Sequence, residues 1–304
     1  MITRFFLRSY CLGLLLAGPL GVFAQETPPK PLASDTDLRI RGIFETALPR
    51  TEKKNSLRLI LHPHLGDLTR KDHLRTVVGL RYGLTNAWEA TVETDTYFTT
   101  GLKAGKFFDD SGFSSLHVGS KYRVGDPFHL GWEAVVGADW IEPINSPPPD
   151  VTDGLRHAVS FVTFSRELKT HPGWRIFFGG NYDDIAPTNI KGELDDNQLT
   201  GDNVGVTAGF VFARGRLNYT LEAAYNTQHP TEDLANDIYV LRPGLMWAVP
   251  PRYTFGARGQ WLLGFSLRLA HGVDGNTVGA SLKLRLNFDL KRLLGRKPTP
   301  AAAP

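Results

Sequence analysis

The sequence predicts an all-β fold, a transmembrane antiparallel up-and-down β-barrel of twelve strands. Between residues 55 and 288, apolar and polar residues alternate in twelve segments of about 9–14 residues, which is the period of a half-buried strand. Short turns and long polar loops follow one another between these segments, as in outer-membrane barrels. Aromatic residues gather near the strand ends on the apolar face, where the girdles at the membrane interface lie.

The alternation is clearest in residues 86–98, where Trp88 and Val92 share one face and Glu89 and Glu93 share the other. The same pattern recurs in residues 128–141, 203–213, 216–226, 253–265 and 277–288. Alternation alone does not say which face is outside. In a secreted sandwich or a lipocalin-like barrel, the apolar face would point inward.

The order of the connections favours the membrane barrel over these soluble folds. The expected long connections are residues 66–72, 99–113, 142–155, 184–202, 227–236 and 266–276. The expected short connections are residues 83–85, 125–127, 168–172, 214–215 and 249–251. A sandwich has no reason to keep this strict order, whereas a barrel has short periplasmic turns at one rim and long extracellular loops at the other. An even strand count then places both termini in the periplasm.

The N-terminus is typical of an export signal. Arg4 and Arg8 precede the apolar residues 11–20, and Val-Phe-Ala at residues 22–24 fits a cleavage site. We therefore expect residues 1–24 to be a signal peptide. No later stretch reaches the about 18 apolar residues that a membrane-spanning helix needs.

Three further regions complete the expected organisation. Residues 25–54 are polar and proline-bearing and predict a periplasmic extension, whose apolar patch at residues 38–48 could plug the barrel. Residues 55–288 form the outer-membrane barrel. Residues 289–304 form a periplasmic tail.

Composition excludes several classes of protein. The chain has 34 Lys+Arg against 31 Asp+Glu, so its formal net charge of +3 is too balanced for a nucleic-acid partner. Its single cysteine, Cys11, excludes a disulfide framework and a cysteine-based zinc site. No phosphate-binding glycine loop on a strand–helix unit occurs, and we expect no cofactor.

The last strand carries a first resemblance. Residues 277–284 (Thr-Val-Gly-Ala-Ser-Leu-Lys-Leu), followed by Phe288, resemble the C-terminal signal read by the bacterial barrel-assembly machinery. The resemblance implies that machinery as a partner during insertion. The sequence departs from the pattern because residues 291–304 follow the terminal aromatic residue.

A second resemblance lies in residues 81–89 (Arg-Tyr-Gly-Leu-Thr-Asn-Ala-Trp-Glu). They resemble a hairpin of an outer-membrane barrel family whose members are labelled as transporters or as "MetA-pathway of phenol degradation" proteins. The match covers one hairpin well and the rest of the chain only by its strand texture. It implies a transporter-like barrel with hydrophobic or aromatic cargo.

If the polar face points inward, charged side chains line the lumen and any substrate path. The basic ones are Arg58, Arg75, Arg81, Lys121, Arg123, Arg175, Arg242, Arg258, Lys283 and Arg285. The acidic ones include Glu89, Glu93, Asp95, Glu133 and Asp139. Bases concentrate on the first and last strands and acids on the third and fifth, which predicts a transverse field across a water-filled pore. The alternative is a lumen filled by salt bridges with no through-path.

Catalytic and metal chemistry find little support. Ser115 and His117 share a strand face, but Ser-x-His reverses the His-x-Ser order of outer-membrane phospholipases. His62 and His64 also share a face, and two ligands need a third to hold a metal. We expect no catalytic residues, no metal site and no enzymatic activity.

The expected function is therefore passage of small molecules through a barrel embedded in outer-membrane lipid. Two alternatives stay open. One is an outer-leaflet lipid-modifying enzyme. The other is a structural or recognition barrel without a pore, whose longest loop, residues 184–202, would contact a partner.

Overall fold

The structure is a computed structural model that describes residues 43–65, 72–99, 110–191, 202–228, 237–250, 253, 260–272 and 275–289. The predicted signal peptide, most of the predicted extension and tail, and Arg258 lie outside the described residues. No helix in the described part is long and apolar enough to cross a membrane.

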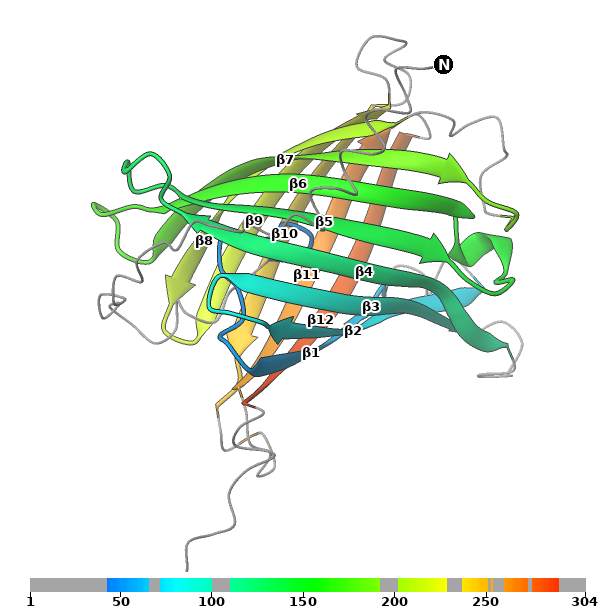
Figure 1. Cartoon of the computed structure of the whole chain (residues 1–304), viewed down its shortest axis with the longest axis horizontal. Helices are drawn as coiled ribbons and strands as arrows, with labels where there is room; N and C mark the ends of the chain where they lie inside the picture. The colour runs from blue at the N-terminus through cyan, green and yellow to red at the C-terminus, as the bar shows by residue number, and fades with distance from the viewer. Residues whose placement is uncertain are drawn as a thin grey trace, which may run out of the picture. The chain divides into compact units, whose positions relative to one another are not determined.

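Twelve antiparallel strands form one closed barrel (Figure 1). The strands are β1 (Ser56–Pro63), β2 (His73–Gly83), β3 (Trp88–Thr99), β4 (Ser111–Gly125), β5 (Glu133–Pro143), β6 (Leu155–Glu167), β7 (Trp174–Pro187), β8 (Asn203–Arg214), β9 (Leu217–Gln228), β10 (Ile238–Ala248), β11 (Gln260–Gly272) and β12 (Gly275–Asp289). A short 3-10 helix, η2 (Pro149–Val151), lies between β5 and β6. The predicted all-β, twelve-stranded, up-and-down barrel is confirmed.

Each strand pairs with its neighbours in sequence, and β1 pairs with β12 to close the ring. Ser56 lies opposite Asp289, so the chain enters and leaves the barrel at the same rim. Closure pairs the backbone of every strand on both sides, which leaves no open edge.

The expected alternation decides which side chains face outward. On β3, the side chain of Val92 is 51% exposed, whereas that of Glu89 is 1% exposed. Leu80 on β2 and Val118 on β4 are exposed beside Val92 on the same outer face. The outer face is thus apolar, and charged side chains turn inward, which is the arrangement of a barrel in lipid rather than in water.

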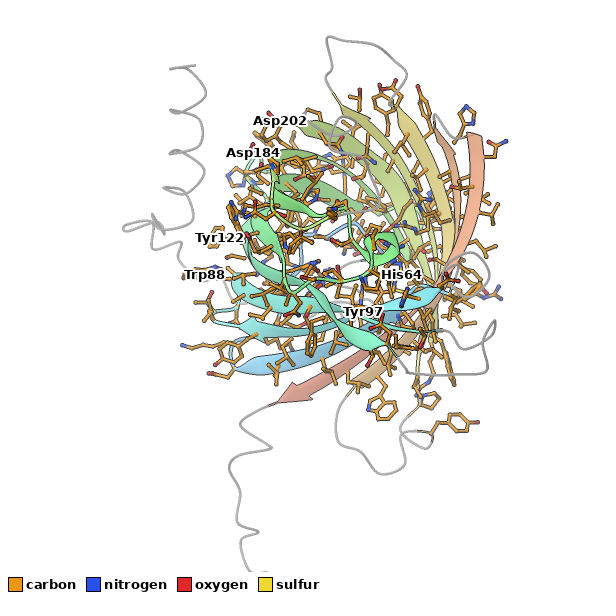
Figure 2. The ribbon with its side chains drawn as sticks, turned by 90° about the vertical axis from the view of Figure 1, so that its right-hand side faces the viewer. His64, Trp88, Tyr97, Tyr122, Asp184 and Asp202 are labelled. Carbon is orange, nitrogen blue, oxygen red and sulfur yellow. The ribbon has the colours of Figure 1, made fainter. Side chains whose placement is uncertain are left out.

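Aromatic side chains form a connected belt on the outer face near the rim of short turns. Phe164 stacks between Phe128 and Phe178 at ring distances of 6.4 and 5.2 Å. Further along the rim, Phe212 stacks with Trp174 at 4.8 Å and lies 6.1 Å from Tyr219. In Figure 2, Trp88 and Tyr122 lie on the outer side of the wall, and His64 lies on its inner side.

The predicted order of connections is correct for the first nine and wrong for the last two. We expected a short connection at residues 249–251, but Ala248 pairs with Leu262 and β11 begins at Gln260, so no tight turn joins β10 to β11 there. Residues 254–259 of the expected strand lie outside the described residues. We expected a long loop at residues 266–276, but β11 continues to Gly272, which pairs with Gly275. Gly275 has a φ of +82°, a conformation that glycine adopts without strain. The dipeptide Asp274-Gly275 is typical of a two-residue hairpin turn, but the prediction followed the alternation pattern and assigned a long loop there.

Candidate functional site

The chain preceding β1 enters the barrel at the rim of short turns. Thr51 Oγ1 donates a hydrogen bond to the carbonyl of Asn86 at 2.8 Å, and Lys54 N donates to Asn86 Oδ1 at 3.1 Å. Both contacts tie the segment to the turn between β2 and β3. From there residues 43–52 run into the interior, and we call them the inner segment.

Apolar side chains of the inner segment pack on the wall from within. Ile43, Phe44 and Leu48 are fully buried. They form one cluster with wall residues of β7, β8, β10 and β11, namely Phe177, Val211, Met246, Ala248 and Leu262. The barrel therefore contains a small hydrophobic core inside its ring. The sequence reasoning missed these wall residues, although each is an apolar residue on an otherwise polar strand face.

Two glycines make room for the Phe44 ring. A Cβ atom on Gly244 would lie 2.4 Å from Phe44 Cε2, and one on Gly264 would lie 3.2 Å from Phe44 Cζ. Such distances are shorter than van der Waals contact. The ring therefore lies flat against a part of the wall that only glycine leaves open.

This fit can be tested by adding one methyl group. Gly244→Ala should lower the free energy of unfolding by about 1–3 kcal/mol, the usual cost of overpacking. The same substitution in a Phe44→Ala background should cost less, because the ring is gone and only the 2.7 Å approach to Thr220 Oγ1 remains. Urea unfolding of the four proteins measures the coupling. Strictly additive effects would mean that Phe44 does not occupy this place.

Charged side chains hold the backbone of the inner segment. Glu222 on β9 accepts hydrogen bonds from the backbone N–H of Phe44 at 3.0 Å and from those of Glu45 and Thr46 at 3.4 Å each. Lys283 on β12 donates to the carbonyl of Phe44 at 2.5 Å, and Arg285 donates to the carbonyl of Ile43. Buried backbone groups need partners, and here the wall supplies them.

The base of the inner segment joins a second charged network. Glu52 N donates to Glu89 Oε2 at 2.7 Å, and the Glu52 carboxylate pairs with Arg58. Lys121 lies 3.3 Å from Glu89. Arg81 lies 2.9 Å from Glu93, which extends the network along β2 and β3.

The structure brings together most of the predicted lumen residues that it describes. Arg175 lies 3.1 Å from Glu133, and Arg242 lies 3.1 Å from Glu45. Asp139 lies against the inner face of Gly119. By strand alternation, Arg75 and Arg123 also face inward, and Asp95 lies on the same inner wall beside Ser115. Acidic and basic side chains thus form ion pairs inside the barrel. These pairs weaken the transverse field that was predicted from bases on the first and last strands and acids on the third and fifth.

Ser115, His117 and Asp95 meet on the inner wall, but their geometry differs from a catalytic triad. Ser115 Oγ lies 2.8 Å from His117 Nε2 and 2.7 Å from Asp95 Oδ2. Asp95 Oδ2 lies 3.2 Å from the same His117 Nε2. In a triad the serine and the carboxylate bind opposite nitrogens of the imidazole. Here both bind one nitrogen, so the carboxylate competes for the position of a general base.

The rings of His62, on β1, and of His64, just after it, are tilted by 31° with their centroids 4.9 Å apart. Within the described ranges, no group of three or more histidine, aspartate or glutamate side chains is arranged to hold a metal ion.

No model of a known protein family matches the sequence, and no curated protein is significantly similar to it. Among solved structures, the chain resembles the COG4313 outer membrane channel from Pseudomonas putida F1, with a TM-score of 0.51 and 12% identity over 79% of this chain and 98% of that chain. A NanC porin aligns with a TM-score of 0.47 and 11% identity over 76% of this chain and 98% of that chain. The outer membrane phospholipase A from Escherichia coli aligns with a TM-score of 0.45 and 10% identity over 76% of this chain and 92% of that chain. The first likeness is one of fold.

Proposed function

We propose that the protein is an integral barrel of the bacterial outer membrane that passes small molecules. We also propose that the inner segment keeps this barrel closed from the periplasmic side. The barrel fold, which the Pseudomonas putida channel shares, supports the location. The apolar outer face and its aromatic belt support it independently. The rim of short turns is then periplasmic, and the chain enters and leaves the barrel there.

The observation that carries the proposal is the inner segment itself. A purely structural barrel could fill its interior with side chains from the wall, as small barrels do. This chain instead inserts its inner segment. The backbone N–H of Phe44 donates to the Glu222 carboxylate, and the carbonyl of Phe44 accepts from Lys283. A peptide that is continuous with the chain before β1 can leave the lumen without breaking any strand pairing. The arrangement therefore fits a closable path better than a solid core.

The interior also favours one class of solute. On β5 and β7, the apolar side chains of Val135 and Phe177 face inward and are buried. They alternate with charged groups such as the pair of Arg175 and Glu133. The walls of β1 to β4 present charged groups such as Arg81 and Glu93. We propose solutes that combine a hydrophobic or aromatic part with a polar group, in keeping with the resemblance of the hairpin at residues 81–89. The predicted lumen residues, including Arg75, Asp95, Asp139 and Arg123, would border that path.

Planar-bilayer conductance tests the proposal. The protein lacking residues 25–50 should show frequent, discrete conductance steps, because Ile43, Phe44 and Leu48 no longer fill the lumen. The truncation keeps Glu52, which pairs with Arg58 and binds Glu89 at the rim. The protein with the inner segment should open rarely under the same conditions. If the truncated protein is folded and inserted but never conducts, the proposed path does not exist.

The cluster around Ser115 makes an acyl hydrolase the second candidate. Because His117 offers one nitrogen to both Ser115 and Asp95, we expect Ser115 to be unreactive. A fluorescent fluorophosphonate should therefore fail to label the detergent-solubilised protein, with or without calcium. Labelling that disappears in Ser115→Ala would establish a nucleophilic serine and revive the enzyme hypothesis.

A further inference from the structure

The connection between β5 and β6 folds over the opposite mouth of the barrel, at the rim of long connections. We call residues 144–154 the strap. Its helix η2 contacts β2, although β2 is three strands away from β5 in the ring. Figure 2 looks into this mouth and shows η2 within the ring of strands, beside His64. Val151 of η2 is 5% exposed, so the strap is packed rather than free in solvent.

Both ends of the strap are held by hydrogen bonds. At its start, Ile144 N donates to the carbonyl of Ser114 at 3.0 Å, and Asn145 Nδ2 donates to the carbonyl of Phe113 at 3.0 Å. At its end, Thr188 Oγ1 donates to the carbonyl of Gly154 at 2.5 Å. Prolines at residues 147–149 restrict the backbone between these points. The strap is therefore a stiff bridge and not a loose loop.

A histidine at the start of β6 fastens the strap to the wall. His157 Nδ1 lies 2.8 Å from Asp183 Oδ2 on β7, and His157 Nε2 lies 2.9 Å from Asp153 Oδ2 on the strap. Ionised carboxylates only accept hydrogen bonds, so both ring nitrogens must donate. Only the positively charged imidazolium does so. The clasp between strap and wall thus depends on a proton on His157.

None of the other groups named here that surround His157 can replace the imidazolium as a donor to Asp153 and Asp183. From β5, Ile141 lies opposite His157, and Asp139 lies one inward position further along the strand. From β7, Ile185 lies opposite His157. Arg156 faces the outside, where it binds Glu142 at 2.5 and 2.6 Å. When His157 is neutral, one carboxylate oxygen faces a ring nitrogen that carries a lone pair, and that contact is lost.

We propose that the strap is a second closure, at the outer mouth, which the His157 imidazolium latches to the wall and which loosens when His157 loses its proton. This device goes beyond the proposed passage function and acts at the opposite end of the lumen from the inner segment. Carboxylates on both sides of the ring favour its charged form over the neutral one. We therefore expect the latch to be present at acidic and neutral pH and to weaken in alkaline solution.

The carboxylate on the strap sets the acid limit of the latch. Burial alone would raise the pKa of Asp153, but hydrogen bonds from His157 and from Leu155 N–H hold that pKa below its ordinary value. The latch should thus survive through mild acid and be lost only when Asp153 takes up a proton.

Thiol labelling can test the latch without any measurement of transport. Cys11 is the chain's sole cysteine and lies in the predicted signal peptide, so a Val151→Cys variant carries one reporter thiol. The rate of its reaction with a bulky, charged maleimide in detergent micelles reports how often the strap leaves the wall. Adding His157→Gln should raise this rate about ten-fold or more at neutral pH, because two charge-assisted hydrogen bonds are weakened.

Three matched variants make the result specific. Asp153→Asn, which alters the strap and no strand, should accelerate labelling as His157→Gln does. Arg156→Gln breaks an ion pair at the same height on the outer face and should leave the rate unchanged. Asn189→Cys, in an exposed connection, corrects for the pH dependence of thiol reactivity. After this correction, the Val151→Cys rate should rise in alkaline solution only while His157 is present.

The proposal is wrong if Val151→Cys reacts equally fast with and without His157 in folded protein, or if the corrected rate does not rise with pH. Folding of each variant is checked by the heat-dependent gel mobility of the barrel. A protein whose latch behaves as expected but which never conducts after truncation would retain the strap device and lose the proposed function. The two inferences therefore fail separately.

Discussion

Val118→Arg should lower the free energy of unfolding in lipid by about 2–4 kcal/mol, the cost of an arginine near the bilayer midplane. Val118 lies at the middle of β4, and its side chain is 49% exposed on the apolar outer face. If that face contacts lipid, water cannot solvate the guanidinium at this depth, and the outward acid Glu142, opposite Leu116, is already paired with Arg156. The arginine must then stretch toward an interface or deform the bilayer around it.

A second exposed valine on the same strand provides the control. Val124 is 45% exposed but lies one residue before the end of β4, at the rim of short turns. Val124→Arg should cost about 0–1 kcal/mol, because the charge can reach the interface. Urea titration of folding into liposomes measures both. Equal and small costs would mean that water, and not lipid, covers the outer face.

The second large effect is expected at the anchor of the inner segment. Glu222→Gln should raise the frequency of open-channel events about ten-fold or more, since hydrogen bonds to a charged acceptor contribute about 1.5–3 kcal/mol. Glu222 accepts the backbone N–H groups of Phe44, Glu45 and Thr46, and it faces Arg242 at 3.4 Å. An amide in its place would direct an NH₂ group at these donors.

Glu133→Gln is the matched control, because it makes the same chemical change at another ion-paired glutamate on the inner face of the wall. Glu133 pairs with Arg175 on β7 and has no contact with the inner segment among the described residues. Glu133→Gln should leave the frequency of channel openings near that of the unchanged protein. If both substitutions open the channel equally, general loosening of the lumen, and not release of the inner segment, controls conduction.

The strands were predictable because one local property sets them. Side chains on a strand point alternately to opposite faces, so a lipid-facing wall imposes a period of two on the sequence, as Trp88 to Phe98 shows. The same argument placed Glu89, Glu93 and Lys121 on the inner face, where the structure has them. The strand count followed because each connection adds one strand.

The boundaries of the last hairpin were not predictable in this way. Alternation predicted a strand that ends at residue 265, but β11 continues to Gly272, and these last residues pair with β12. Pairing is a contact between two strands, so the residue pattern within one strand does not specify where that pairing ends. The hairpin signal of Asp274-Gly275 was the local clue, and it indicated the shorter connection.

The fold class, the number of strands and the residues that share a face were all readable from the sequence, because they follow from the alternation of side chains along each strand. How the interior is filled became visible in the folded barrel alone. The pairing of Arg285 with the carbonyl of Ile43 joins residues that lie at opposite ends of the chain. The clasp of His157 between Asp153 and Asp183 depends in the same way on three separate elements. Such contacts arise from closure of the ring, which brings distant residues together, and no local period encodes them.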